Sequence, residues 1–143
     1  MEPRGLLELV LEVADLDRSL NFYRDRLGMP EVTRWPDERP GAWVRLGPNE
    51  VLGLWPAASG GPGVGIHDAR GGTHVHFAVY VEPETLELWR ERLAAEGLDV
   101  EGPVVFGSGR SLFLTDPDGN VVELGEWQSD WEGKPVVKAA QAR

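Results

Sequence analysis

Two side chains that can bind a metal ion occupy equivalent places in an internal repeat of this chain. When the sequence is aligned with itself at an offset of 66, residues 8–27 match residues 74–93 without a gap. At the first aligned position Glu8 falls on His74. Carboxylates and imidazoles both bind divalent transition metals. The repeat therefore predicts a duplicated fold with a metal site on its pseudo-twofold axis.

The composition is that of a soluble protein with one domain. The chain has 143 residues, of which 41% are hydrophobic and 27% charged. Its net charge of −10 argues against nucleic acid and anionic membranes as partners, because both attract basic surfaces. The absence of cysteine excludes disulfides, thiolate nucleophiles and sulfur-ligated metals. With no leader pattern and no membrane-spanning apolar run, we expect a cytoplasmic protein.

The first half of the chain has the pattern of one strand, one helix and three further strands. The alternation of residues 6–13 predicts a strand, and Asp15 can cap a helix that Gly28 ends. Leu16, Leu20, Tyr23 and Leu27 form one apolar stripe on that helix. Short strands are expected near 31–35, 42–46 and 51–55.

The second half repeats this order. A strand is expected over 73–81, then a helix with Pro83 in its first turn, then strands near 99–106, 111–115 and 120–126. The segment 116–120 is a turn signature. The prediction is an α+β fold of two tandem βαβββ modules, about 6–56 and 73–127, forming a cupped, barrel-like eight-stranded arrangement with the helices outside. This domain spans 1–128, and residues 129–143 form a C-terminal tail.

Strand alternation assigns the polar side chains to the concave side of each sheet. Glu8 points inward from the first strand, His74 and His76 from the fifth, and Glu123 from the eighth. Aligning the last strands of the two halves puts Glu123 opposite Gly53, so the fourth symmetric position has no ligand. The residues expected to line a substrate site are Trp43, Arg45, Trp55, Tyr80 and Phe113.

Several further residues have two interpretations. His76 could move a proton beside the metal or simply line the pocket. Arg110 could clamp an anionic substrate or be an ordinary surface arginine. The glycine-rich segment 57–72 could be a linker or a lid that brings His67 or Arg70 to a ligand.

Three blocks of sequence resemble the vicinal oxygen chelate superfamily, which contains glyoxalase I, extradiol dioxygenases, fosfomycin-resistance enzymes and bleomycin-binding proteins. They are residues 9–23 with Leu27-Gly28 behind them, residues 72–79, and residues 111–124. The resemblance covers about residues 6–127. It implies the paired-module fold and, as a further expectation, a homodimer.

The resemblance also implies a ligand set. Carried over position by position, the metal ligands are Glu8, His74 and Glu123, with Gly53 at the optional fourth place. Two carboxylates and one imidazole suit Mn, Fe, Ni or Zn as the divalent metal ion. In this family the metal chelates two neighbouring oxygens of a small-molecule substrate and stabilises the negative charge that develops. Glu8, Glu123 and His76 are the candidates for moving protons.

The sequence also leaves other functions open. Without a metal, Glu8 and Glu123 would form a carboxylate pair of the general acid/base type. A metal-free protein resembling the bleomycin-resistance proteins could stack a flat cationic ligand on its tryptophans, of which the chain has six. A regulatory or structural dimer module is a third hypothesis.

Overall fold

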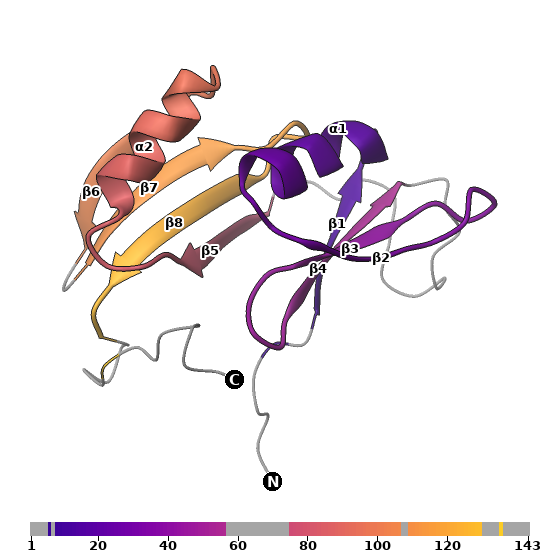
Figure 1. Ribbon diagram of the computed structural model, residues 1–143, viewed down its shortest axis with the longest axis horizontal. Helices are drawn as coiled ribbons and strands as arrows, with labels where there is room; N and C mark the ends of the chain where they lie inside the picture. The colour runs from indigo at the N-terminus through magenta and orange to yellow at the C-terminus, as the bar shows by residue number, and fades with distance from the viewer. Residues whose placement is uncertain (1–5, 7, 57–74, 107–108, 130–134, 136–143) are drawn as a thin grey trace, which may run out of the picture. The chain divides into compact units, whose positions relative to one another are not determined.

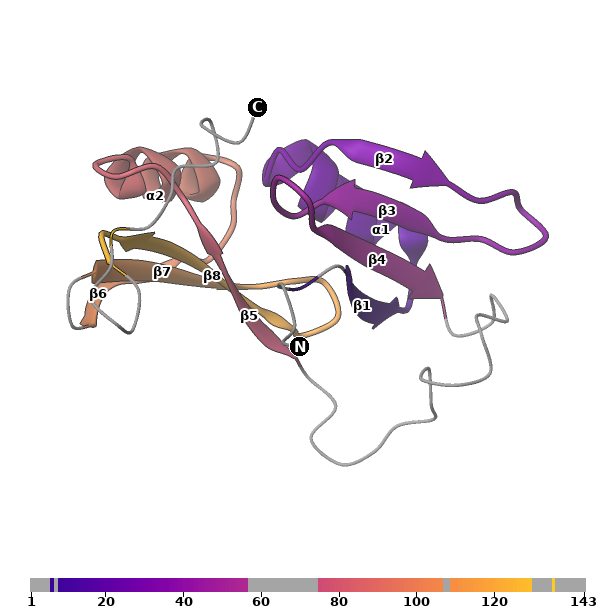
Figure 2. The same cartoon turned by 90° about the horizontal axis from the view of Figure 1, so that it is seen from below.

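The structure is a computed structural model that describes residue 6 and residues 8–56, 75–106, 109–129 and 135 (Figures 1 and 2). The chain divides into two compact units, Met1–Thr73 and His74–Arg143. Within the described residues, no helix is long and apolar enough to cross a membrane.

Unit 1 is a four-stranded mixed sheet with one helical segment. Its elements are β1 (Glu8–Val13), α1 (Leu16–Leu20), η1 (Asn21–Arg26), β2 (Glu31–Arg34), β3 (Ala42–Arg45) and β4 (Val51–Pro56). The strand order is β1-β4-β3-β2, as Figure 2 shows. β1 runs parallel to β4, whereas the pairs β4–β3 and β3–β2 are antiparallel.

Unit 2 has the same topology. Its elements are β5 (His76–Tyr80), α2 (Leu86–Ala95), β6 (Glu101–Phe106), β7 (Gly109–Thr115) and β8 (Val121–Trp127). The order is β5-β8-β7-β6, with β5 parallel to β8, and α2 lies along one face of this sheet (Figure 1). The predicted α+β fold of two βαβββ modules is confirmed, and the strands form two separate ladders of four.

The core of each unit lies between the helix and one face of the sheet. Period-2 alternation puts Leu11 and Val13 of β1 on that face in unit 1, and Leu112 and Leu124 in unit 2, all at most 2% exposed. The helices contribute Leu20, Tyr23, Leu86 and Leu93, which are equally buried. We call the opposite side of each sheet the helix-free face. Glu8, His76 and Glu123 lie there because they alternate with the core residues.

The first helix is not a regular α-helix throughout. The sequence predicts a single stripe from Leu16 to Leu27, but residues Asn21–Arg26 form a π-helical segment, and the Leu27 N–H donates to the Phe22 carbonyl at 3.0 Å. The wider turn brings Phe22 into the core beside Tyr23, with an edge-to-face ring distance of 5.0 Å. Phe22 was outside the predicted stripe because a period of 3.6 residues does not include it.

The second helix begins later than predicted. Thr85 is its N-cap and Leu86 its first residue, so Pro83 lies in the preceding turn and not in the helix. In that turn the Thr85 N–H donates to the Glu82 carbonyl, and Glu84 has a φ of 67°. The connection from strand to helix is therefore longer in unit 2 than in unit 1, where Asp15 caps α1 directly after β1.

This longer turn changes the register of the internal repeat. The first residues of the helices, Leu16 and Leu86, differ by 70 positions and not by 66. The error is one helical turn, which leaves every residue on the same face, and for that reason the 66-residue offset matched the apolar stripe. Self-alignment of an amphipathic helix can be wrong by a whole turn without disturbing its pattern.

Strand pairing gives the equivalence of the first and fifth strands. Val10 pairs with Gly53 in unit 1, and Ala78 pairs with Glu123 in unit 2. If Gly53 and Glu123 are equivalent, as the sequence predicts, then Val10 corresponds to Ala78 and Glu8 to His76. The alignment of Glu8 with His74 is therefore shifted by two residues, which again preserves the face because strand side chains repeat every second residue.

Candidate functional site

Glu123 is a buried carboxylate on the helix-free face of unit 2. It lies in the middle of β8 and is 8% exposed. Its Oε1 accepts a hydrogen bond from Ser111 Oγ of β7 at 2.6 Å, and its Oε2 lies 3.1 Å from His76 Nε2 of β5. Side chains from three adjacent strands thus meet at one carboxylate.

The turn that precedes β8 sets this register. Asp116 Oδ1 accepts hydrogen bonds from the backbone N–H groups of Asp118 and Asn120, at 2.9 and 2.7 Å. The Asn120 side chain then accepts from the Val75 N–H at 2.9 Å. This last bond ties the start of β5 to the start of β8. The turn motif of the sequence therefore places His76 where it can reach Glu123.

The histidine of this pair is accessible. The His76 side chain is 55% exposed, and its ring meets Phe113 of β7 edge-on with a centroid distance of 5.9 Å. Bonds of about 2.0–2.2 Å to a Zn²⁺-sized ion separate two ligand atoms of one ion by about 3–3.5 Å. The 3.1 Å between Nε2 and Oε2 fits such a pair.

Glu8 is the corresponding acidic residue of unit 1. It is half-buried at the start of β1, and its Oε1 accepts a hydrogen bond from Trp43 Nε1 of β3 at 2.7 Å. A Cβ added at Gly53 of β4 would lie 2.8 Å from the same oxygen and 3.0 Å from Trp55 Nε1. The Glu8 carboxylate therefore occupies the space that a side chain at position 53 would need.

Glu8 and His76 have equivalent neighbours in the two units, in agreement with the corrected register of the repeat. Trp43 pairs with Gly53 across β3 and β4, and Phe113 pairs with Glu123 across β7 and β8. Trp43 contacts Glu8, and Phe113 contacts His76. His74, the other histidine predicted from the sequence, lies outside the described residues, as do His67 and Arg70.

In the described part of the chain, Glu8 and Glu123 make no ion pair with lysine or arginine. Glu31 differs: hydrogen bonds from Arg34 and then Arg24 hold the pKa of its carboxyl below the ordinary 4.5. A buried carboxylate without a counter-charge is costly unless a cation joins it.

The donor chemistry fits a divalent cation, although the described residues contain no cluster of three such ligands, His74 not being among them. Glu8 and the Glu123–His76 pair belong to different units. Each of them offers an oxygen or nitrogen on a helix-free face.

Three tryptophans form a cluster on the helix-free face of unit 1. Trp35 meets Trp43 edge-on at 4.9 Å and Trp55 at 4.6 Å with a tilt of 50°. A Cβ on Gly41 would lie 2.2 Å from the Trp55 ring, so this glycine makes room for the indole. The sequence predicted Trp43 and Trp55 at this face and missed Trp35, which follows the end of β2.

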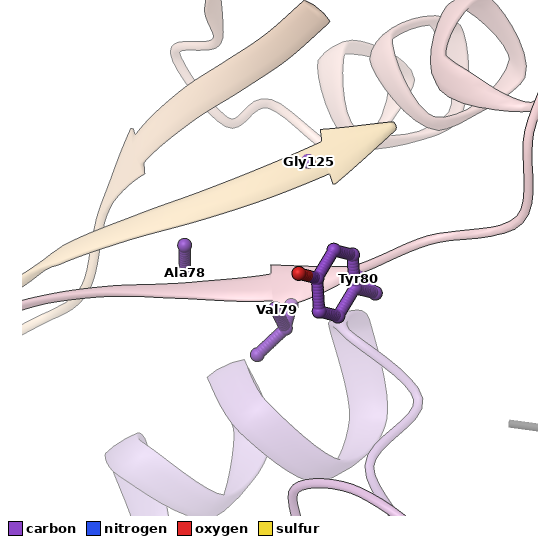
Figure 3. A pocket seen from close by; sticks show the side chains of 4 residues that line it. All are labelled: Ala78, Val79, Tyr80 and Gly125. Atoms are coloured by element: carbon purple, nitrogen blue, oxygen red, sulfur yellow. The ribbon is translucent and has the colours of Figure 1, made fainter. Parts of the chain in front are cut away.

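A small pocket lies along the β5–β8 pair of unit 2. It has a volume of about 140 Å³ and is lined by Ala78, Val79, Tyr80 and Gly125 (Figure 3). Tyr80 is 59% exposed, and Gly125 pairs with it across the strands. Gly125 corresponds in the repeat to Trp55, so the pocket lies beside a position that carries no side chain in this unit.

The two arginines expected at the substrate site, Arg110 and Arg45, lie in different environments. Arg110 alternates with Ser111, so it lies on the helix side of β7, where it pairs with Glu87 of α2 at 3.4 Å and Glu126 of β8 at 3.1 Å. It does not join the Glu123 group. Arg45 is exposed at the end of β3.

Ser111 is the residue that the sequence analysis overlooked. It is completely buried and lies two positions before Phe113 on the same face of β7. The alternation that selected Phe113 also selects Ser111, so a signal was present. A serine is common in strands, however, and only its 2.6 Å bond to Glu123 distinguishes it.

Comparison with known proteins gives the family. The model of the Glyoxalase/Bleomycin resistance protein/Dioxygenase superfamily matches residues 5–124. The chain belongs to this superfamily. Among superfamily structures, a lactoylglutathione lyase from Agrobacterium tumefaciens aligns over 87% of this chain and 95% of its own, with a TM-score of 0.72 and 26% identity.

Two relatives show the range of the superfamily. Glutathione transferase FosA of Serratia marcescens is 28% identical over 85% of this chain and 79% of its own length. A putative lactoylglutathione lyase of Brassica oleracea is 31% identical over 86% of this chain, which spans only 44% of that relative.

Proposed function

We propose that this protein is a metal-dependent enzyme in which a divalent cation activates a small substrate carrying two neighbouring oxygen atoms. The observation that carries the proposal is the pair of Glu123 and His76: a buried carboxylate faces an accessible imidazole at 3.1 Å, and no lysine or arginine of the described residues neutralises it. Glu8 is the expected third ligand.

The proposal assigns the histidine ligand to His76. The sequence favoured His74 because of the 66-residue offset. The strand pairing makes His76 the counterpart of Glu8, and its Nε2 already lies at a ligand-pair distance from Glu123. His74 remains the alternative, and matched alanine variants separate the two.

When bound, a cation such as Mn²⁺, Fe²⁺, Ni²⁺ or Zn²⁺ would act as a Lewis acid on the substrate oxygens. The side chains perform the other tasks. Glu8 uses only Oε1 for its bond to Trp43, and its Oε2 has no bond to a described residue, so Oε2 can bind the cation and, when released from it, accept a proton. The pocket beside Gly125, on the same strand as Glu123, suits a small carbon skeleton, with the Tyr80 ring along it.

The reaction is of the isomerase/lyase or the dioxygenase type. The names of the relatives, glutathione transferase and lactoylglutathione lyase, favour glutathione-dependent substrates as the first to be tested. We also propose that the protein is cytoplasmic and forms a homodimer. Sedimentation equilibrium, which gives the mass of the particle, tests the dimer.

Elemental analysis of protein purified without chelator tests the metal. We expect about one Mn, Fe, Ni or Zn per chain, with loss of the metal in Glu123→Gln and His76→Ala and retention in His74→Ala. Glu126→Gln is the matched control, since Glu126 is also a buried carboxylate of β8 but lies on the helix side.

Wild-type protein that binds no metal even after reconstitution with each cation would contradict the proposal. Loss of metal in His74→Ala and retention in His76→Ala would reverse the assignment of the histidine. A Glu8→Ala variant that keeps full affinity would remove Glu8 from the ligand set.

The tryptophan cluster favours a second candidate function, the binding of a flat aromatic cation without catalysis. Three indoles beside the Glu8 carboxylate are the elements of a stacking site for such a ligand. Acridine orange added to metal-free protein tests it. Quenching of tryptophan fluorescence that saturates and is lost in Trp55→Ala would support binding. An unsaturable response would reject it.

A further inference from the structure

We propose that Trp43 and Ser111 are positioning residues that make Glu8 and Glu123 single-oxygen metal ligands. This inference rests on the proposed metal site and goes beyond it, because neither residue is itself a ligand. Each is a neutral donor from the same sheet as its carboxylate: Trp43 reaches Glu8 Oε1 from β3 across the intervening β4, and Ser111 binds Glu123 Oε1 from the adjacent strand β7.

The geometry of unit 1 carries the first half of the inference. The Trp43 indole N–H donates to Glu8 at 2.7 Å across Gly53. Glycine at position 53 is what allows this contact, since a Cβ there would come within 2.8 Å of the carboxylate oxygen. Gly53 therefore has two effects. It supplies no fourth ligand, and it leaves room for Trp43 to orient Glu8, the first ligand.

In unit 2 a different donor binds one oxygen of the carboxylate. Ser111 is completely buried, and its hydroxyl donates to Glu123 at 2.6 Å. The other oxygen faces His76. A donor on one oxygen fixes the carboxylate plane and leaves the second oxygen for a cation.

The neutrality of both donors matters. An arginine in either place would also orient the carboxylate, but it would cancel the charge that attracts a cation, as Arg24 and Arg34 do for Glu31. An indole N–H and a hydroxyl give direction without neutralisation. Neither donor therefore brings a positive charge that would compete with the ion.

Calorimetric titration of chelator-treated protein with Mn²⁺ tests the inference in the variants Trp43→Phe and Ser111→Ala. Loss of an outer hydrogen bond to a metal ligand weakens affinity by about 10–100-fold, and we expect a Kd increase in this range for each variant. Trp35→Phe is the matched control, because it changes an indole of the same cluster whose ring contacts Trp43 and Trp55 but not Glu8. Ser111→Thr keeps the hydroxyl and should restore the affinity.

A spectroscopic measurement separates positioning from general structural damage. With Co²⁺ as the probe, release of a carboxylate to two-oxygen binding raises the coordination number and lowers the intensity of the visible d–d bands. We expect this change in Trp43→Phe and not in Trp35→Phe.

Different results would contradict the proposed metal site and the proposed positioning role. No Mn²⁺ binding by the wild type would overturn the metal site and this inference with it. Tight wild-type binding with unchanged affinity and unchanged Co²⁺ spectra in Trp43→Phe and Ser111→Ala would leave the site standing and overturn the positioning role. Equal weakening by Trp35→Phe and Trp43→Phe would also overturn it.

Discussion

At the scale of single residues, this protein shows how a glycine can define a polar site. Gly53 stands at the place where the repeat has Glu123 in the other unit, and it carries no ligand. The structure gives it another role: the space above it holds the Glu8 carboxylate and the edge of Trp55.

Gly53→Ala should therefore disturb Glu8 more than its size suggests. The new methyl group would lie 2.8 Å from Glu8 Oε1 and 3.0 Å from Trp55 Nε1, closer than ordinary contacts. We expect the Glu8–Trp43 hydrogen bond to break and the Mn²⁺ affinity to fall about tenfold.

Gly41→Ala is the comparison for this prediction. It would strike the Trp55 ring but not Glu8, so it should lower stability and leave the metal affinity near that of the wild type. Equal metal affinities in both alanine variants would contradict the role assigned to Gly53. Calorimetry gives the affinity, and urea unfolding gives the stability.

At the scale of elements, ion pairs join the π-helical segment to the edge strand β2. Glu31 of β2 accepts from Arg24 of η1 at 2.7 Å and from Arg34 at 2.8 Å. These two hydrogen bonds, that of Arg34 first, lower the pKa of Glu31, and the bond to Arg24 likewise lowers the pKa of Asp25.

The stability conferred by Glu31 should depend on pH. Because its folded-state pKa lies below 4.5, its contribution is complete above that value and is lost as the pH falls through the folded-state pKa. Glu31→Gln should lower the free energy of unfolding by about 0.5–1 kcal/mol at pH 7 and have a smaller effect at about pH 2, where less of the Glu31 charge remains.

Urea unfolding at both pH values measures this difference. The exposed Glu101 of β6 provides the control variant, Glu101→Gln, whose effect should be small throughout. A penalty for Glu31→Gln that is as large in acid as at neutrality would mean that packing, and not charge, accounts for it.

At the scale of the whole molecule, the two units repeat one topology with different polar residues. Glu8 corresponds to His76, Trp43 to Phe113, Gly53 to Glu123 and Trp55 to Gly125. One unit thus has an aromatic cluster, and the other has a carboxylate–imidazole pair with a small pocket. A duplicated fold keeps its core and changes its helix-free face.

Cation binding should stabilise the chain as a whole. A ligand at 100 times its Kd adds about 2.7 kcal/mol to the free energy of unfolding, which corresponds to a rise in Tm of about 5–10 °C for a chain of this length. Differential scanning calorimetry with and without Mn²⁺ measures the rise.

The rise should disappear in Glu123→Gln and persist in Glu126→Gln. The two carboxylates are equally buried, at 8% exposed, but only Glu123 lies on the helix-free face. Loss of the rise in both variants would show that the cation acts through general charge and not through the Glu123 site.

The sequence by itself determined the fold class, the order of the elements and the faces of the strands. Periodicity carries this information, because a period of 2 or 3.6 states which residues share a side. It placed Glu8, His76, Trp43, Phe113 and Glu123 on the helix-free faces and the turn at 116–120 before the last strand.

The tertiary structure decided the register. A shift of two residues in a strand or of four in a helix leaves every face unchanged, so periodicity could not choose between His74 and His76 as the counterpart of Glu8. The strands of the two units differ by 68 positions and the helices by 70, so unit 2 has two additional residues between β5 and α2. This insertion became visible only through strand pairing. The partners of the carboxylates, Ser111 and Trp43, also depend on which strands lie side by side, and contacts between distant segments leave no periodic signal.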